Sequence, residues 1–108
     1  MALRTHELSA PALHITWLSP SWLRLEGEVD ISNHEELVEA LSPLLDEEGD
    51  VHLDLAGLGF ISVRATGSLV TLAGWLQPHR RLILHDPPHG LERVILIGWG
   101  DAPGLEVA

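Results

Sequence analysis

The sequence predicts a single α/β domain, with a mixed sheet of four or five strands and three or four helices packed mainly on one face of the sheet. Segments in which apolar and polar residues alternate, as in strands, take turns along the chain with segments in which apolar residues recur at helical spacing. The composition agrees, because 45% of the 108 residues are hydrophobic and 20% are charged, as in globular proteins. A chain of this length forms one core rather than two, so we expect a single domain. We expect this domain to cover residues 13–108 and residues 1–12 to be a flexible lead.

The first part of the domain predicts a hairpin followed by a helix. Residues 13–18 and 22–26 alternate as strands do, and serine and proline occupy the turn between them. The helix begins at Ser32, which stands three residues before Glu35, the spacing of a capping box. Pro43 would cost a helix interior about 3 kcal/mol, so we expect the helix to end before it and a further turn to begin there.

The rest of the chain predicts strand, helix, strand, helix and a short closing strand. These segments are strands over 51–55, 81–85 and 105–107, a second helix whose inward stripe is Ala65, Leu69, Leu72 and Leu76, and a third helix over 90–97 with Leu91, Val94 and Ile95 inward. A short turn and a second apolar step, Phe60–Ile61, separate the first of these strands from the second helix.

The charge balance narrows the class of partner. Sixteen acids against six basic residues give a net charge of −10, which repels phosphate backbones and argues against nucleic-acid binding. The same charge suits a basic protein partner, and solubility alone is the other explanation for it. No apolar run approaches the roughly 20 residues of a membrane-spanning helix, so we expect no membrane insertion. With no cysteine, a cytoplasmic location is expected.

No motif predicts an enzyme, a cofactor or a metal site. There is no nucleophile elbow and no cysteine nucleophile, and nothing in the sequence brings Asp30 and Asp54 together as an acid–base pair. His79, His85 and His89 lack the spacing of zinc ligands. We therefore expect a binding protein rather than a catalyst.

Several short stretches resemble those of the STAS domain, the sulfate-transporter and anti-sigma-factor-antagonist module. Leu25–Asp30 is similar to the family's Gly-Glu-Leu-Asp entry to the first helix, and Arg81–Leu84 to the apolar strand before its third helix. Asp54–Gly57 and Phe60–Ile61 are similar to its central strand and the turn that follows. The resemblance covers residues 13–107. It implies the same fold and a non-enzymatic, bacterial regulatory function like that of an anti-sigma-factor antagonist.

The resemblance fails at the residue that carries the family's switch. Where regulatory members have Asp-Ser-Ser-Gly, with a serine that a partner kinase phosphorylates, this chain has Ser62-Val-Arg-Ala65. Arg64 stands at the phosphoacceptor position and cannot accept a phosphoryl group. Ser62 and Thr66 remain as fallback acceptors, but Ser62 is more simply the helix N-cap, and we expect Thr66 to be a surface residue.

The family docks on its kinase or anti-sigma partner through the loop before the second helix and through that helix. The resemblance therefore implies that Ser62, Val63, Arg64 and Thr66, with Asp30 nearby, contact a protein partner of that class. Since Arg64 replaces the phosphoacceptor, we expect docking without release by phosphorylation.

A different class of function remains open, namely that of a structural or assembly subunit. If the third helix turns Leu91, Val94 and Ile95 to the core, Leu96 points elsewhere, and with Trp99 it forms an apolar patch. Such a patch would suit self-association, a homo-oligomer, or a scaffold role in a larger complex, including the cytoplasmic side of a transporter.

Overall fold

The computed structural model describes residues 12–108, so all of the predicted lead except Ala12 lies outside the described residues. The elements are β1 (Leu13–Ser19), β2 (Trp22–Val29), α2 (His34–Leu41), the 3-10 helix η2 (Ser42–Asp46), β3 (Val51–Ile61), α3 (Val63–Leu76), β4 (Leu82–His85), α4 (Leu91–Trp99) and β5 (Leu105–Val107). In the described part of the chain, no helix is long and apolar enough to cross a membrane.

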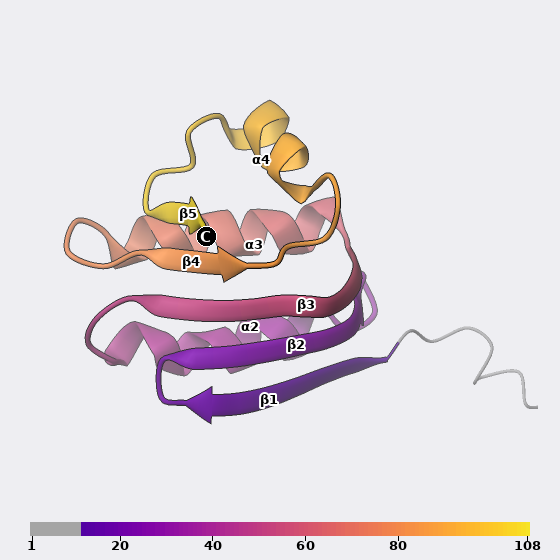
Figure 1. The fold of residues 1–108 in the computed structure, drawn as a ribbon, viewed down its shortest axis with the longest axis horizontal. Helices are drawn as coiled ribbons and strands as arrows, with labels where there is room; N and C mark the ends of the chain where they lie inside the picture. The colour runs from indigo at the N-terminus through magenta and orange to yellow at the C-terminus, as the bar shows by residue number, and fades with distance from the viewer. Residues whose placement is uncertain (1–11) are drawn as a thin grey trace, which may run out of the picture.

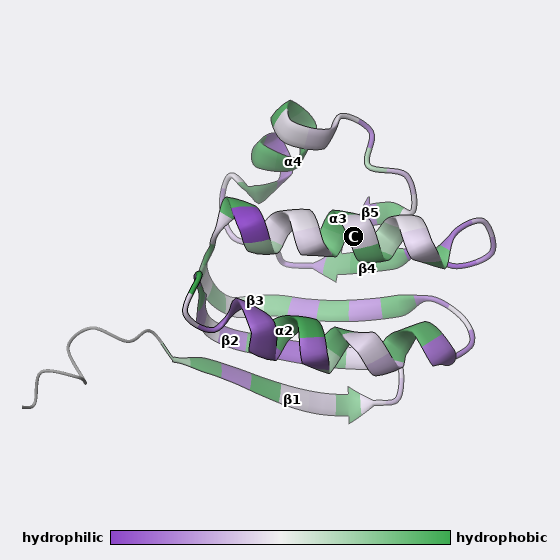
Figure 2. Ribbon diagram, turned by 180° about the vertical axis from the view of Figure 1, so that it is seen from behind, coloured by the Kyte–Doolittle hydropathy of each residue, from purple (hydrophilic) through white to green (hydrophobic). Residues whose placement is uncertain are grey.

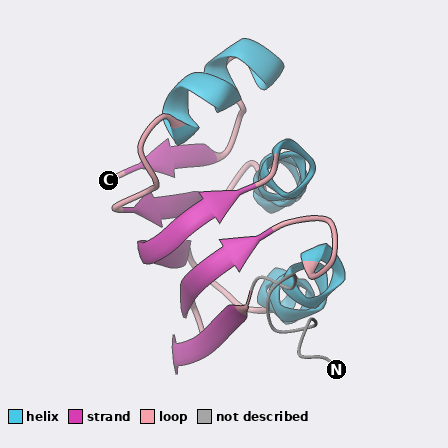
Figure 3. Cartoon of the chain, turned by 90° about the vertical axis from the view of Figure 1, so that its right-hand side faces the viewer, coloured by secondary structure: helices cyan, strands magenta, loops and turns pink. Residues whose placement is uncertain are grey.

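The five strands form one mixed sheet in the order β1-β2-β3-β4-β5 (Figure 1). The hairpin of β1 and β2 is antiparallel, and the other three pairings are parallel. Helices α2 and α3 lie along one face of the sheet, and α4 lies at its β5 end and packs against α3 (Figure 3). The predicted fold class is confirmed, with five strands.

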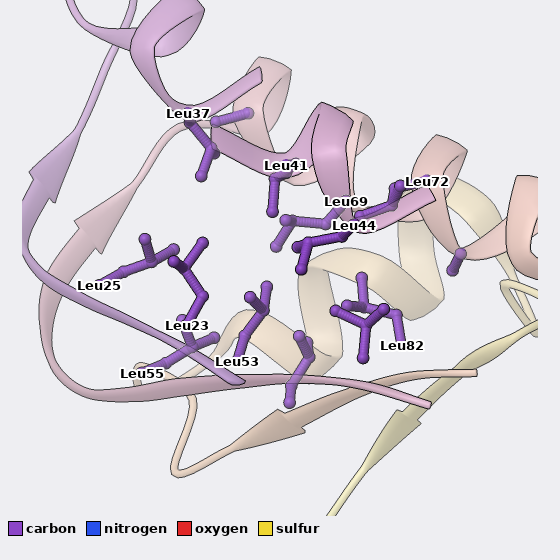
Figure 4. Packing of buried hydrophobic residues seen from close by; sticks show 14 of the residues in the cluster. Leu23, Leu25, Leu37, Leu41, Leu44, Leu53, Leu55, Leu69, Leu72 and Leu82 are labelled. Carbon is purple, nitrogen blue, oxygen red and sulfur yellow. The ribbon is translucent and has the colours of Figure 1, made fainter. Parts of the chain in front are cut away.

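Leucine side chains from both layers fill the space between the sheet and its helices. Leu23, Leu25, Leu53 and Leu55 point from β2 and β3 toward the helices, and all four are fully buried (Figure 4). Leu37 and Leu41 from α2, Leu44 from η2, and Leu69 and Leu72 from α3 meet them. The residues that alternate with buried side chains along these strands, such as Arg24 and His52, therefore point to the face that α2 and α3 leave uncovered. Figure 2 shows α2 and α3 in front of the sheet, with hydrophilic stretches on α2.

The first helix begins one residue later than a Ser32 cap requires, so that part of the prediction is wrong. The N-cap is Asn33, whose side chain makes no capping bond. Instead, the nearly buried Asn33 amide accepts a hydrogen bond from the Asp30 N–H (2.9 Å) and donates one to the Glu28 carbonyl (2.9 Å). Asn33 thus closes the loop between β2 and α2. The predicted end of the helix before Pro43 is confirmed.

Strand β3 is longer than predicted, because it continues to Ile61 without the expected turn. Its pairing with β2 shifts register between Arg24 and Glu26 and again after Gly27. Gly57 lies at the first shift, where a Cβ atom would stand 2.8 Å from the Glu26 Cγ atom. The glycine therefore leaves room for the Glu26 side chain, and pairing with β2 overrides the local turn signal.

Helix α4 faces the core with fewer residues than predicted. Leu91 and Ile95 are buried, as expected, but Val94 is 36% exposed and lies on the flank of the helix. Leu91 and Ile95 are four positions apart and lie one turn above the other, and they are the buried residues of this nine-residue helix.

Candidate functional site

Adjacent parallel strands place two loops side by side at one edge of the sheet. Strands β2 and β3 both end there, and the Ser62 N–H donates a hydrogen bond to the Val29 carbonyl across the gap (2.9 Å). The loop that carries Asp30 therefore lies beside the turn that opens α3. This is the edge at which open α/β sheets usually bind their ligands.

The loop after β2 is held by its own polar groups. The Asp30 carboxylate accepts hydrogen bonds from the Ser32 N–H (2.8 Å) and from the Ser32 hydroxyl (2.6 Å). These bonds lower the pKa of Asp30 below its usual value, so the carboxylate stays charged near neutral pH. Between these residues, Ile31 is 78% exposed. The loop thus presents a charge and a large apolar side chain together.

The start of α3 is capped as predicted. The Ser62 hydroxyl oxygen accepts a hydrogen bond from the Ala65 N–H (3.1 Å), which confirms Ser62 as the N-cap. The expectation of a surface position for Thr66 is wrong, because Thr66 is fully buried. Its hydroxyl donates to the Ser62 carbonyl (2.9 Å), as threonine side chains within helices often do, and so needs no contact with water.

Arg64 and Val63 point outward from the first turn of α3. Val63 is 64% exposed, and Arg64 is also exposed. Arg64 lines a shallow hollow between α3 and α2, together with His34, Glu35, Val38 and Glu39. Arg64 therefore shares this hollow with two acidic residues of α2, Glu35 and Glu39.

Five residues of the two loops and their flanks are exposed or half-exposed, and we call them the carboxyl-edge surface. They are Asp30, Ile31, Phe60, Val63 and Arg64. Sequence reasoning singled out Asp30, Val63 and Arg64 but missed Ile31 and Phe60, which is 49% exposed. The sequence did offer a sign that Ile31 is exposed, because it follows the end of a strand and stands between two polar residues, Asp30 and Ser32.

A second hollow opens next to this surface. It has a volume of about 240 Å³ and lies between the end of β3, the first turn of α3 and the loop before α4. Phe60, Val63 and Val94 contribute apolar walls, and Pro88 and His89 come from the loop. The exposed apolar side chains of the edge thus border a concave surface.

The predicted apolar patch on α4 has a different composition. Leu96 is 65% exposed and Ile97 is 78% exposed, but Trp99 is only half-exposed and packs on α3. A Cβ atom at Gly67 would stand 3.0 Å from the Trp99 ring. Trp99 is therefore an anchor between α3 and α4, and Leu96 and Ile97 form the exposed patch.

Within residues 12–108, no three histidine, aspartate or glutamate side chains are placed to hold a metal ion. Asp54 lies on the uncovered face of the sheet, where it pairs with Arg24 (3.0 Å) rather than with Asp30.

Comparison with known proteins identifies the family. A family model described as "Mlab, STAS domain" matches residues 18–105. The fold is similar to that in "Structure of the Anti-Sigma Factor Antagonist SpoIIAA in its Unphosphorylated Form", with a TM-score of 0.64 and 16% sequence identity over 90% of this chain and 88% of that chain. No curated protein matches. The chain therefore belongs to the STAS domain family.

Proposed function

We propose that this STAS domain is a non-enzymatic regulatory module that binds a protein partner through the carboxyl-edge surface. The observation that carries the proposal is that two adjacent loops expose Ile31, Phe60 and Val63, all about half exposed or more, together with the charged side chains of Asp30 and Arg64. An apolar centre with a charged rim is typical of protein interfaces. Two rigid loops hold this surface, since Ser62 and Asn33 fix them with hydrogen bonds.

The partner is of the anti-sigma-factor or kinase class, as in the relatives that the chain resembles. Its surface is basic, because the net charge of −10 and the exposed Glu35, Glu36 and Glu39 on α2 favour association with positive charge. We place this interaction in the cytoplasm.

The docking is not controlled by serine phosphorylation at the start of α3. Arg64 occupies the position of the family's acceptor, the Ser62 hydroxyl is engaged as the helix cap, and Thr66 is buried. The positive Arg64 side chain also lies near the helix end that favours an anion. The module therefore stays in its binding state unless its abundance or another signal changes.

Two equally exposed isoleucines provide a matched test. Ile31 and Ile97 are each 78% exposed, but only Ile31 belongs to the carboxyl-edge surface. Proteins captured from a lysate of the source organism by the immobilised domain are compared by quantitative mass spectrometry with those captured by Ile31→Asp and Ile97→Asp. A partner lost with Ile31→Asp and kept with Ile97→Asp supports the proposal, and equal recovery by both contradicts it.

A second candidate function is that of an assembly subunit that binds through α4. The observation in its favour is the exposure of Leu96 and Ile97 on adjacent positions of one helix. In that case Ile97→Asp is the variant that loses the partner. Light scattering at several concentrations tests self-association, and Ile97→Asp then lowers the measured mass to that of a single chain.

A further inference from the structure

Three aromatic rings lie stacked on the face of the sheet opposite α2 and α3. Trp22 of β2 lies parallel to His52 of β3, with ring centroids 4.3 Å apart and an angle of 3° between the planes. The same indole also covers His85 of β4, at 4.5 Å and 24°. All three point this way because Leu23, Leu53 and Leu84 alternate with them toward the core.

The two histidines under the indole share a hydrogen bond. The His52 Nδ1 and His85 Nε2 atoms are 2.9 Å apart. A bond of this length needs one N–H donor and one lone pair. Two neutral rings meet that need, and so does one imidazolium beside one neutral ring. Two imidazolium rings do not, because both facing nitrogens would then carry a proton.

A proton fits between these nitrogens better than a metal ion does. The ring centroids are 5.2 Å apart, so the two nitrogens face each other nearly in line. Two nitrogens that bind one tetrahedral metal ion through bonds of about 2.0 Å lie about 3.3 Å apart, and two that face each other across the ion in line lie about 4 Å apart. Moreover, no third ligand converges on them among residues 12–108.

The charges around the pair are few and mostly engaged. They are Arg24 on β2, which pairs with Asp54 on β3, Asp50 before β3, Asp86 after β4, and the ion pair of Arg81 with Glu106 on β5. Burial and the neighbouring His85 lower the pKa of His52, and Asp50 opposes them in part. Charge on His85 also helps to lower the pKa of Asp54. The surroundings thus tolerate one positive ring and disfavour two.

We propose that His52 and His85 form a shared proton-binding site on the open face of the sheet, and that a second proton separates the two rings and releases Trp22 from its stacking on them. The first proton leaves the bond in place, because the charged ring donates to the neutral one. The second removes the acceptor lone pair and sets two like charges side by side. Acidification then breaks the stacking and the hydrogen bond by which Trp22, His52 and His85 join β2, β3 and β4. This device is independent of the carboxyl-edge surface.

Nuclear magnetic resonance titration of the whole chain tests the shared site. We expect the ring signals of His52 and His85 each to respond to two steps, separated by more than about one pH unit. In the His85→Gln variant, His52 has no second histidine beside it, so its ring signal should show a single step. That step should lie at higher pH than the second step of the native chain. His14→Gln, a change of an exposed histidine on β1, is the control and should leave both steps unchanged.

Tryptophan fluorescence tests the release of the indole without changing either histidine. The native chain should show a change in emission across the second step, and Trp22→Phe should lack it while keeping the two histidine steps. Single independent titrations of His52 and His85 in the native chain would overturn the proposal. So would an emission that stays constant through the second step.

Discussion

Two hydroxyl side chains flank Arg64 at the start of α3, and each already has a partner within the helix. Ser62 accepts from the Ala65 N–H, and Thr66 donates to the Ser62 carbonyl. The first turn of α3 is therefore complete without a phosphate.

Removing the cap should weaken the fold by a predictable amount. Ser62→Ala leaves the Ala65 N–H without its partner and is expected to lower the free energy of unfolding by about 1 kcal/mol. Ser62→Asp keeps a capping oxygen and adds a charge that the helix N-terminus favours, so it should stay close to the native value. Urea unfolding measures both, and equal stability of the alanine variant would contradict the capping role.

The proposed absence of a phosphorylation switch can be tested by intact-mass spectrometry. Incubation of the native chain with ATP and the kinase recovered with it should leave the intact mass unchanged. Arg64→Ser restores a hydroxyl at the family position and should gain one phosphate under the same conditions. A stoichiometric phosphate on the native chain would show that Ser62 or another residue serves as acceptor.

At the scale of the elements, α3 contacts α2 on one side and α4 on the other. The His34 ring and the Ser68 hydroxyl lie 2.6 Å apart between α2 and α3. On the other side, Trp99 packs against Gly67 and joins α3 to α4. These contacts fix the helix whose first turn carries Val63 and Arg64.

The two glycines of α3 differ in what surrounds them. A Cβ atom at Gly74 would meet no atom within 4 Å, but one at Gly67 would stand 3.0 Å from the Trp99 ring. Replacing glycine by alanine inside a helix gains up to about 1 kcal/mol. We therefore expect Gly74→Ala to raise the free energy of unfolding, and Gly67→Ala to raise it less or to lower it. Urea unfolding checks this, and a larger gain from Gly67→Ala would contradict the packing role of Trp99.

Local patterns in the sequence predicted the elements better than the contacts between them. Alternation and helical spacing predicted each strand and helix of the domain, and the Ser62 cap, because these depend on neighbours along the chain. The extension of β3 through Gly57 depends on pairing with β2, and the place of Asn33 depends on the Glu28 carbonyl. The meeting of His52 with His85 depends on strand register, so no local pattern could reveal it.

At the scale of the whole molecule, charge sets how partners approach. A net charge of −10 on 108 residues favours a basic surface at long range. Binding through the carboxyl-edge surface should therefore weaken as salt rises from 0.05 to 0.5 M, by about tenfold or more. Surface plasmon resonance with the captured partner measures this, and an affinity independent of salt would contradict a basic partner.

Stability should depend on pH in two separate ranges. In the folded state the pKa of His52 lies below its ordinary value of 6.5. As the pH falls, the unfolded chain therefore takes up this proton before the folded chain does, and the free energy of unfolding decreases as the pH drops below 6.5. Asp30 and Asp54 have pKa values below their ordinary 3.8, so their contribution is present above that value and is lost in stronger acid. Urea unfolding between pH 5 and 8 should show the first decline. His52→Gln should flatten it, and an unchanged slope would argue against His52 as its source.

The strand order of the sheet also bears on how the protein is made. Because the strands lie in the order β1-β2-β3-β4-β5, each one pairs with the strand that precedes it in the chain. As the ribosome releases the chain from its N-terminus, every new strand finds its partner already synthesised. Each described strand after β1 can therefore pair along one edge as soon as it is released, which shortens the time during which that edge is open to wrong pairing. The domain can thus grow strand by strand on the nascent chain.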